Sequence, residues 1–262
     1  MPVISRRHFM TLALGSLLAP PLHAHATPQV HRVSYHADVG ILYGMLSLHL
    51  EGTIEETIDR PSGRYRVIAR GAGRGIANRI EAAGTLRGKH WVPVHSVSWF
   101  DVSGRQSWTE IAYDWAARRI EYHARGETFF LRRVRVVDDV IELDGETHVD
   151  DVVSATLNFS ERRWIHVQMG RYATVIVRRK RTDEEGPDDV APPYRAELVP
   201  FELKIVSDHA GKVSALFDLS RFSSWASPAR PARILFGETG RPEVVTSSMM
   251  LGTSVTIRFS RS

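Results

Sequence analysis

Residues 109–123 read TEIAYDWAARRIEYH, and this stretch decides the fold class. Residues 109–113 and 119–123 each alternate between apolar and polar side chains, which is the period of a strand with one face against a core. Two such strands separated by a short turn predict an antiparallel pair. The centre of the chain is therefore read as part of a β-meander.

The same alternation extends to both sides of this stretch. Glycine-bearing turns are predicted at residues 103–105 and 124–126, because glycine accepts the positive φ that tight turns require. The pattern predicts a mainly β protein, built on a large curved antiparallel sheet or a partly open barrel. Further runs with full or partial alternation are residues 32–37, 44–50, 65–69, 94–99, 129–131, 134–137, 172–177, 196–206 and 255–259.

Three segments interrupt the strand pattern. Residues 76–83 have a helix-forming composition between glycines and could form a short helix or an extended strand, of which the helix is preferred. Residues 150–157 begin with Asp150 and Asp151, whose carboxylates suit a helix N-terminus. Residues 182–193 are acidic and proline-rich, which is typical of a solvated loop. The fold prediction therefore includes one or two short helices.

The N-terminal residues 1–26 carry the features of a twin-arginine signal peptide. Arg6 and Arg7 precede a short apolar segment at residues 10–18, and Ala24-His25-Ala26 is a cleavage pattern for signal peptidase. The apolar segment is shorter than the roughly 20 residues that a membrane-spanning helix needs. We predict cleavage after Ala26, a periplasmic location, no integral membrane segment in the processed protein, and a single antiparallel β domain over residues 27–262.

Composition restricts the function classes further. The formal net charge is +4, and loss of Arg6 and Arg7 with the signal leaves +2, so no nucleic-acid partner is predicted. The chain has no cysteine, which excludes thiolate metal sites and a cysteine nucleophile. The 12 histidines show no spacing typical of a metal site, and we predict neither a metal nor a cofactor.

Several stretches together resemble one exported bacterial family. They are residues 33–35 followed by 40–44, the Pro93-Val94 step, residues 151–155 and residues 240–244. On these features, residues 30–259 resemble the family called domain of unknown function 3108. The resemblance implies an envelope location and a curved, largely antiparallel sheet, and it implies no particular activity.

Aromatic side chains are concentrated between residues 91 and 122. Four of them, Trp99, Trp108, Tyr113 and Tyr122, are candidate ligand-binding residues, on the hypothesis that several line one face of the sheet. The alternative is that they fill the core, where aromatic residues bury the most area.

Catalytic signatures are weak by comparison. His148, Asp150 and Asp151 form the densest local group of titratable residues, but a loop histidine before a helix cap accounts for them. No Gly-x-Ser-x-Gly motif is present in the sequence, and no catalytic residue is assigned.

The preferred function is non-catalytic binding of a hydrophobic or envelope-derived ligand, such as a lipid, or of an envelope protein partner. The alternative is an envelope hydrolase that acts on cell-wall or lipid material through carboxylates and histidine, so whether the protein is an enzyme is left open. An open apolar concavity of several hundred Å³ would favour a lipid carrier.

Overall fold

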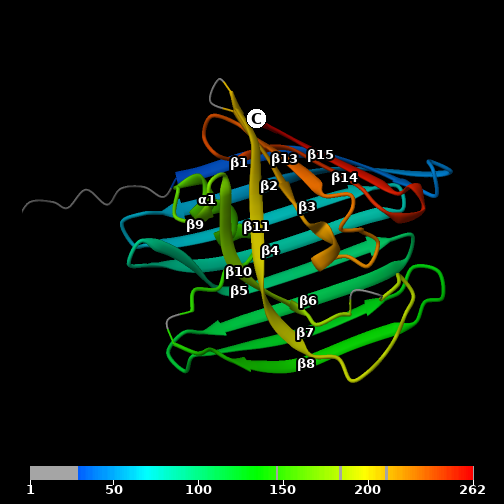
Figure 1. The fold of residues 1–262 in the computed structure, drawn as a ribbon, viewed down its shortest axis with the longest axis horizontal. Helices are drawn as coiled ribbons and strands as arrows, with labels where there is room; N and C mark the ends of the chain where they lie inside the picture. The colour runs from blue at the N-terminus through cyan, green and yellow to red at the C-terminus, as the bar shows by residue number, and fades with distance from the viewer. Residues whose placement is uncertain (1–28, 146, 183–184, 210–211, 262) are drawn as a thin grey trace, which may run out of the picture.

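The computed structural model describes residues 29–145, 147–182, 185–209 and 212–261, and the predicted signal peptide lies outside these ranges. One 15-stranded sheet dominates the fold, and every strand pairing in it is antiparallel (Figure 1). The strands are β1 (Gln29–Ile41), β2 (Leu46–Asp59), β3 (Arg64–Gly73), β4 (Ile76–Arg87), β5 (His90–Val102), β6 (Arg105–Asp114), β7 (Arg119–Glu127), β8 (Val134–Glu142), β9 (Ile165–Gln168), β10 (Arg171–Arg179), β11 (Ala196–His209), β12 (Lys212–Phe217), β13 (Ala232–Phe236), β14 (Pro242–Ser248) and β15 (Ser254–Arg261).

The strand order is a meander that starts in the middle of the sheet. It runs β8-β7-β6-β5-β4-β3-β2-β1-β15-β14-β13-β12-β11-β10-β9, so β1 pairs with both β2 and β15. The two edge strands are β8 and β9, which are consecutive in the chain. The sheet curves strongly but does not close into a barrel, which confirms the predicted fold class.

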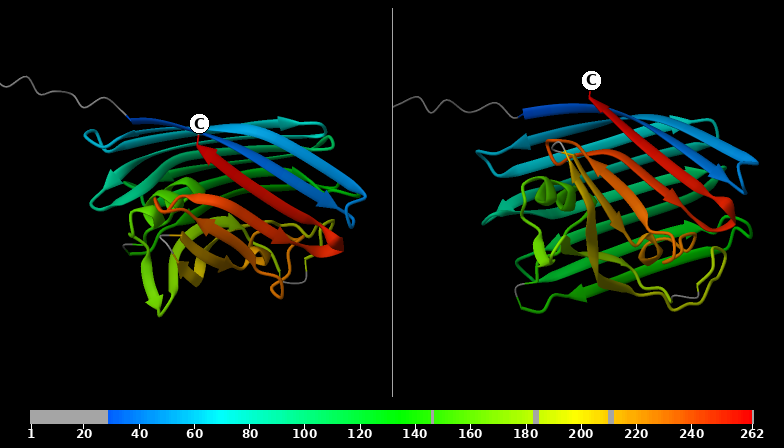
Figure 2. Two further views of the ribbon diagram at one scale, coloured as in Figure 1. Left: turned by 90° about the horizontal axis from the view of Figure 1, so that it is seen from above. Right: turned by 45° about the horizontal axis from the view of Figure 1, so that its top comes forward.

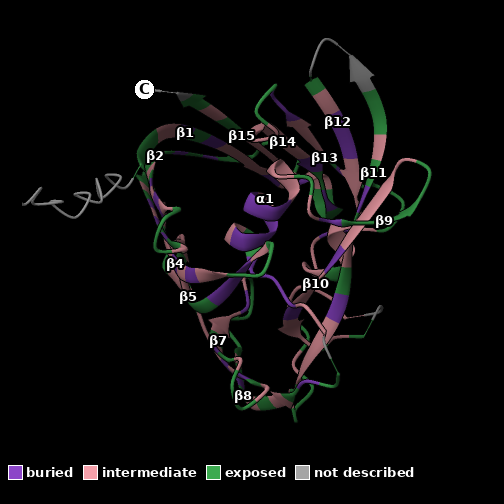
Figure 3. Ribbon diagram, turned by 90° about the vertical axis from the view of Figure 1, so that its left-hand side faces the viewer, coloured by how far each residue is buried: buried purple, intermediate pink, exposed green. Residues whose placement is uncertain are grey.

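Among the described residues a single α-helix, α1 (Val152–Ser160), connects the two edges and lies inside the curve of the sheet (Figure 3). Leu157 of α1 packs in the core cluster of β2–β5, whereas Ala155 packs in the cluster formed with β11, β12 and β13. In Figures 1 and 2, β10 and β11 cross over the layer formed by β4–β8. The helix therefore fills the space between two halves of the sheet, of which the first contains β2–β5 and the second contains β11–β13.

The helix predicted at residues 76–83 is wrong, because these residues belong to β4. Its small residues leave space for aromatic rings from the neighbouring strand. A Cβ atom at Gly84 would lie 2.4 Å from Cε1 of Tyr65, and Ala82 is buried in the same cluster. At this end of β4 the small residues Ala82 and Gly84 therefore fit beside Tyr65, and tertiary packing outweighs the local helix propensity.

The turn predicted at residues 124–126 and the strand predicted at residues 129–131 are also wrong. Residues 124–126 lie within β7, where Gly126 pairs with Ser107 and Arg135. The chain reverses between residues 128 and 133 instead. There the hydroxyl of Thr128 accepts a hydrogen bond from the Arg133 amide at 2.9 Å, so a side chain defines the loop.

Candidate functional site

The predicted group of His148, Asp150 and Asp151 is assembled at the start of α1. Asp151 is the N-cap: its carboxylate accepts from the Ser154 amide at 2.6 Å, and the Ser154 hydroxyl accepts from the Asp151 amide at 3.0 Å. This reciprocal pair is a capping box, in which two otherwise unpaired helix amides are satisfied. The prediction that these aspartates open a helix is confirmed.

Asp150 is the centre of a buried hydrogen-bond network. Its side chain is 1% exposed and accepts from the Ser154 hydroxyl at 2.7 Å, the Asn158 amide at 2.9 Å and the Thr174 hydroxyl at 2.6 Å. His148 Nε2 lies 3.1 Å from the same carboxylate. Because Thr174 belongs to β10, this one carboxylate joins α1 to the second half of the sheet.

Asn158 makes the matching connection to the first half of the sheet. Its side-chain oxygen accepts from the Trp91 amide at 2.9 Å, and its nitrogen donates to the Trp91 carbonyl at 2.8 Å. Trp91 lies on β5 and is fully buried. The polar groups of α1 therefore hold both halves of the sheet against the helix.

Asp151 has the most perturbed carboxyl group of this network. Burial raises its pKa to about 6 and the nearby Asp150 adds to the rise, although hydrogen bonds from Ser154 oppose it. Its Oδ2 atom is buried and has no hydrogen-bond partner among the described residues, and the hydroxyl groups of Tyr65 and Tyr113 are also buried. Burial and the charge of Asp151 raise the pKa of both tyrosines. Chemically, the group can take up a proton in the core.

The four candidate ligand-binding aromatics do not share one surface. Trp99 pairs directly with Trp108 across β5 and β6, whereas Tyr113 lies five residues after Trp108 on the same strand and so has the opposite side-chain direction. Tyr113 and Tyr122 are 4% and 6% exposed, within the core cluster of β6–β8. Their role in ligand binding stays a prediction.

A groove that sequence reasoning missed lies where β12 stops pairing with β11. The pairing between these strands ends at Lys204 and Leu216, so the Pro200 side of β11 is covered by the chain that follows β12. The groove has a volume of 270 Å³. Its walls include Phe201, Phe217 and Phe222, with ring centroids 5.4 and 5.6 Å from that of Phe201.

Charged side chains surround this aromatic groove. Arg171, Lys204 and Arg221 are basic, and Glu202 and Asp218 are acidic. The Arg171–Glu202 and Arg221–Asp218 ion pairs are long, at 3.9 and 3.7 Å. No described carboxylate pairs with Lys204. The groove therefore offers aromatic surface together with one excess positive charge, a combination suited to an anionic ligand with an apolar part.

A second hollow has less distinctive chemistry. Its volume is 370 Å³ and it lies over β1 and β2, where its lining includes Tyr35, His36, Glu51 and Gly52. The ring of Tyr35 lies directly against the backbone of Gly52, since a Cβ atom at Gly52 would be 2.4 Å from Cζ of Tyr35. This hollow lacks the cluster of aromatic rings and basic groups that marks the first.

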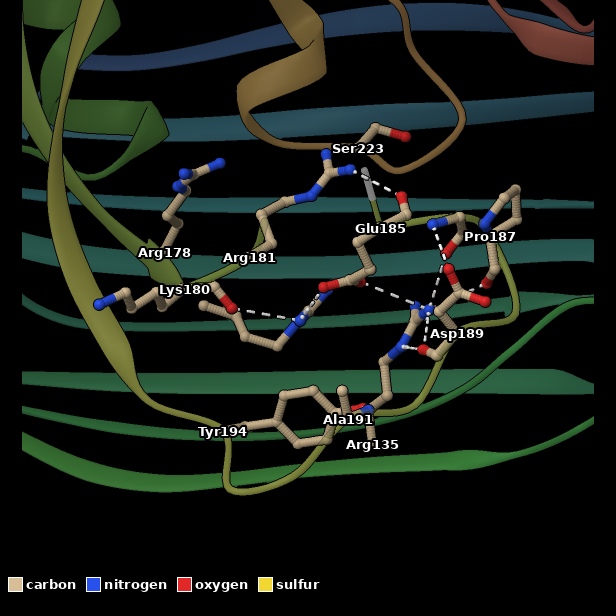
Figure 4. A network of polar contacts seen from close by, with 12 residues as sticks. Arg135, Arg178, Lys180, Arg181, Glu185, Pro187, Asp189, Ala191, Tyr194 and Ser223 are labelled. Carbon is tan, nitrogen blue, oxygen red and sulfur yellow. Dashed lines mark hydrogen bonds and ion pairs between the residues drawn. The ribbon is translucent and has the colours of Figure 1, made fainter. Parts of the chain in front are cut away.

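The open side of the sheet is closed by residues 185–196, which we call the strap. The Arg135 guanidinium, from β8, donates to the carbonyl groups of Gly186, Pro187 and Asp189 (Figure 4). Arg135 also lies 3.5 Å from the Glu185 carboxylate, which is 10% exposed. The loop predicted as solvated at residues 182–193 is thus partly buried where the structure describes it.

Two further carboxylates complete the attachment of the strap. Asp139, on β8, accepts from the Ala196 amide at 2.8 Å and from Arg195 at 2.9 Å. Burial opposes ionisation of Asp139, but these hydrogen bonds hold its pKa below the ordinary value. Asp188 accepts from the Leu131 amide at 2.7 Å. The edge strand β8 and the β7–β8 loop are therefore attached to the strap by side-chain hydrogen bonds.

Comparison with known proteins gives a structural likeness and no family match. No family model matches the chain, and no curated protein matches it. The chain is similar to a crystal structure of a β-barrel-like protein of domain of unknown function DUF1849 from Brucella abortus, with 11% identity and a TM-score of 0.40. The match covers 89% of this chain and 96% of that chain. The resemblance to domain of unknown function 3108 stays a prediction.

The described residues contain no helix of the length and apolarity needed to cross a bilayer.

Proposed function

We propose that this chain is exported through the twin-arginine pathway and acts in the periplasm as a non-catalytic binding protein. Its ligand is an anionic molecule with an apolar part, derived from the cell envelope. The aromatic groove between β11 and β12 is the proposed binding site. The proposal rests on one observation: three phenylalanines and three basic side chains line the same groove.

The size of the groove limits the ligand. Pockets for drug-sized ligands range from about 300 to 1,000 Å³, so a hollow of 270 Å³ accommodates a small molecule or one end of a larger one. Inside the curve of the sheet, α1 packs against both β2–β5 and β11–β13. The proposal therefore places the ligand at the groove and not inside the curve of the sheet.

The hydrolase alternative has weaker support. Asp150, Asp151 and His148 do meet, and the pKa of Asp151 is displaced, which is typical of active sites. Both aspartates are nonetheless under 10% exposed, and their hydrogen bonds go to the residues that hold α1 in place. Their arrangement serves the stability of the fold.

The first test is titration with 8-anilinonaphthalene-1-sulfonate, a fluorescent probe that combines aromatic rings with an anionic group. Phe222→Ala is expected to weaken its affinity about tenfold, and Arg221→Gln about fivefold, which corresponds to about 1 kcal/mol for an exposed charge. Arg125→Gln is the matched control, because Arg125 is exposed on β7, away from the groove. Circular dichroism verifies that each variant is folded.

Equal affinity in the wild type and in the Phe222 and Arg221 variants would remove the groove as the binding site. Native mass spectrometry of protein isolated from the periplasm of the producing cell then addresses the natural ligand. A co-purifying small molecule that is lost in Phe222→Ala supports the proposal, and a ligand retained in that variant contradicts it.

A further inference from the structure

The turns at one end of the sheet form a connected rim. In a meander, the turns after β1, β3, β5 and β7 all lie at the same end. The Ser103 amide donates to the Gly75 carbonyl at 2.7 Å, and Arg132 donates to the Gly104 carbonyl at 2.8 Å. These bonds link three successive turns, so the rim is a defined surface.

The β14–β15 turn completes this rim beside the β1–β2 turn (Figure 2). The β1–β15 pairing ends at Gly40 and Ser254, and the ring of Tyr43 lies against Gly252, where a Cβ atom would be 2.3 Å from Cδ1 of the ring. On the other side, the Met250 amide donates to the Trp225 carbonyl at 2.6 Å. Trp225 in turn packs on Phe129 and Phe130 of the β7–β8 loop, with centroid distances of 5.5 Å.

The tips of the rim expose large apolar side chains. In the β1–β2 turn, Tyr43 is 84% and Met45 87% exposed. In the same rim, Leu251 is 44% and Leu131 58% exposed, and Phe130 and Met250 are both 43% exposed. Contiguous exposed apolar surface of this kind marks contact with a partner or a membrane.

The backbone conformation of these tips adds a second free-energy cost to that of exposing apolar side chains. Leu42, Tyr43 and Leu251 have φ values of 53°, 59° and 53°, in the left-handed region that glycine and asparagine favour. A non-glycine residue in that region costs on the order of 1 kcal/mol or more. Turns built only to reverse the chain would use glycine or asparagine, so bulky apolar residues at these positions point to a role for their side chains.

Basic residues alternate with these apolar tips. Arg74 and Arg133 are exposed, and no described carboxylate pairs with either. Arg230 is also exposed, and among the described residues its guanidinium donates only to the Met249 carbonyl, at 3.4 Å. The nearby carboxylates have partners: Glu127 pairs with Arg132, Asp101 accepts from the Gly104 amide, and Asp188 accepts from the Leu131 amide. The rim therefore carries free positive charge beside exposed apolar groups.

We propose that this rim docks on the surface of an anionic lipid bilayer. The apolar tips enter the boundary between headgroups and acyl chains, and Arg74, Arg133 and Arg230 lie at the level of the lipid phosphates. Apolar insertion and attraction of basic residues to anionic lipids act together in peripheral binding. Charge complementarity favours this occupant over a second copy of the chain, whose rim would present the same positive charges.

The test uses residues 27–262, which include every strand and the helix that the structure describes. Co-sedimentation is measured with vesicles of phosphatidylcholine alone and of phosphatidylcholine with 20% phosphatidylglycerol. We expect binding to the anionic vesicles, a decrease in 0.5 M NaCl, and an at least tenfold loss in the double variant Tyr43→Ser/Met45→Ser. Arg133→Gln is expected to lower binding to the anionic vesicles about fivefold.

Met169→Ser is the matched control. Met169 is 94% exposed at the β9–β10 turn, away from the rim, so this variant loses an equally exposed apolar side chain and is expected to bind as the wild type does. Thermal unfolding by circular dichroism verifies that all variants are folded.

Three results would overturn the proposal. They are absence of binding to the anionic vesicles, equal binding by wild type and the double variant, and equal losses in the double variant and Met169→Ser. Light scattering tests the other possible occupant. If the wild type and Met169→Ser are dimers and the double variant is a monomer, the rim binds a second copy of the chain and not a bilayer.

Discussion

The two carboxylate oxygens of Asp151 have different environments. One caps α1 through the Ser154 amide, whereas the other is buried without a hydrogen-bond partner among the described residues, and its charge acts on Tyr65 and Tyr113. A buried acceptor without a partner favours the protonated carboxyl, because the neutral form loses less hydration on burial. At the residue scale, this position combines a structural cap with a group that changes charge near pH 6.

The raised pKa of Asp151 predicts a pH dependence of stability. The folded carboxyl titrates at about 6 and the unfolded one near 3.8, so the folded state binds more protons between these values. Its contribution to stability is therefore fully present below pH 3.8 and is lost as the pH rises through 6. Asp151→Asn keeps the cap and removes the titration.

The measurement is urea denaturation of wild type and Asp151→Asn at pH 4, 5, 6 and 7. The wild type is expected to lose stability relative to the variant as the pH rises. The difference, variant minus wild type, in the free energy of unfolding is expected to increase by up to about 3 kcal/mol between pH 4 and pH 7. A constant difference across this range would contradict the raised pKa.

The sequence allowed the cap to be predicted but not the network around it. Two adjacent aspartates before an apolar run are a local signal, and local signals specify helix ends well. Thr174 and Asn158 contact Asp150 through the tertiary fold, from positions 24 and 8 residues away. The aromatic groove was missed for the same reason, since Phe201 and Phe222 meet only when β12 ends.

At the scale of the elements, α1 packs against both halves of the sheet and stabilises their arrangement. Leu157 is fully buried in the cluster of β2–β5, while Val152 on the same helix is 74% exposed. Leu157→Ala is expected to lower the free energy of unfolding by about 3 kcal/mol, because it leaves a cavity in this cluster. Val152→Ala is the matched control, with an expected change below about 0.5 kcal/mol in the same denaturation experiment. Equal effects of the two changes would be inconsistent with this packing.

The errors in strand prediction have one physical origin. Local propensity favours a helix at residues 76–83, but all of these residues pair with β3, and Gly84, directly after them, accommodates Tyr65. Glycine at position 126 suggested a turn, although it lies in a regular strand. In both places tertiary pairing outweighed local preference, whereas the alternating segments were identified because their pattern reflects the core directly.

At the scale of the whole molecule, the strap replaces the strand pairing that would close a barrel. Asp139→Ala removes the acceptor for the Ala196 amide and for Arg195, and it is expected to cost about 1–2 kcal/mol. Hydrogen exchange followed by mass spectrometry is expected to show faster exchange in the strap. Asp138→Ala is the control, since the Asp138 side chain is 80% exposed and pairs only with His123 among the described residues. Unchanged exchange in Asp139→Ala would contradict the role of the strap.

The alternation of apolar and polar residues predicted a curved or partly open sheet, but it did not predict that the strap is attached to β8. The strap is irregular in backbone and acidic in composition, so its sequence is typical of a loop in solvent. Its attachment depends on Arg135 and Asp139, which project from β8 about 50 residues earlier in the chain. Contacts between a loop and a distant edge strand leave no periodic signature.

The position of β1 between β2 and β15 has a consequence for biosynthesis. The eight residue pairs from Val33–Arg261 to Gly40–Ser254 cannot form until β15 has been made. Translation of the roughly 220 residues that separate the end of β1 from the end of β15 takes about 10–40 s at 5–20 residues per second. During this interval one side of β1 is an unpaired edge, which favours aggregation. A transport route that accepts only folded cargo must therefore wait for the last strand, and a molecular chaperone that covers β1 would protect the nascent chain until then.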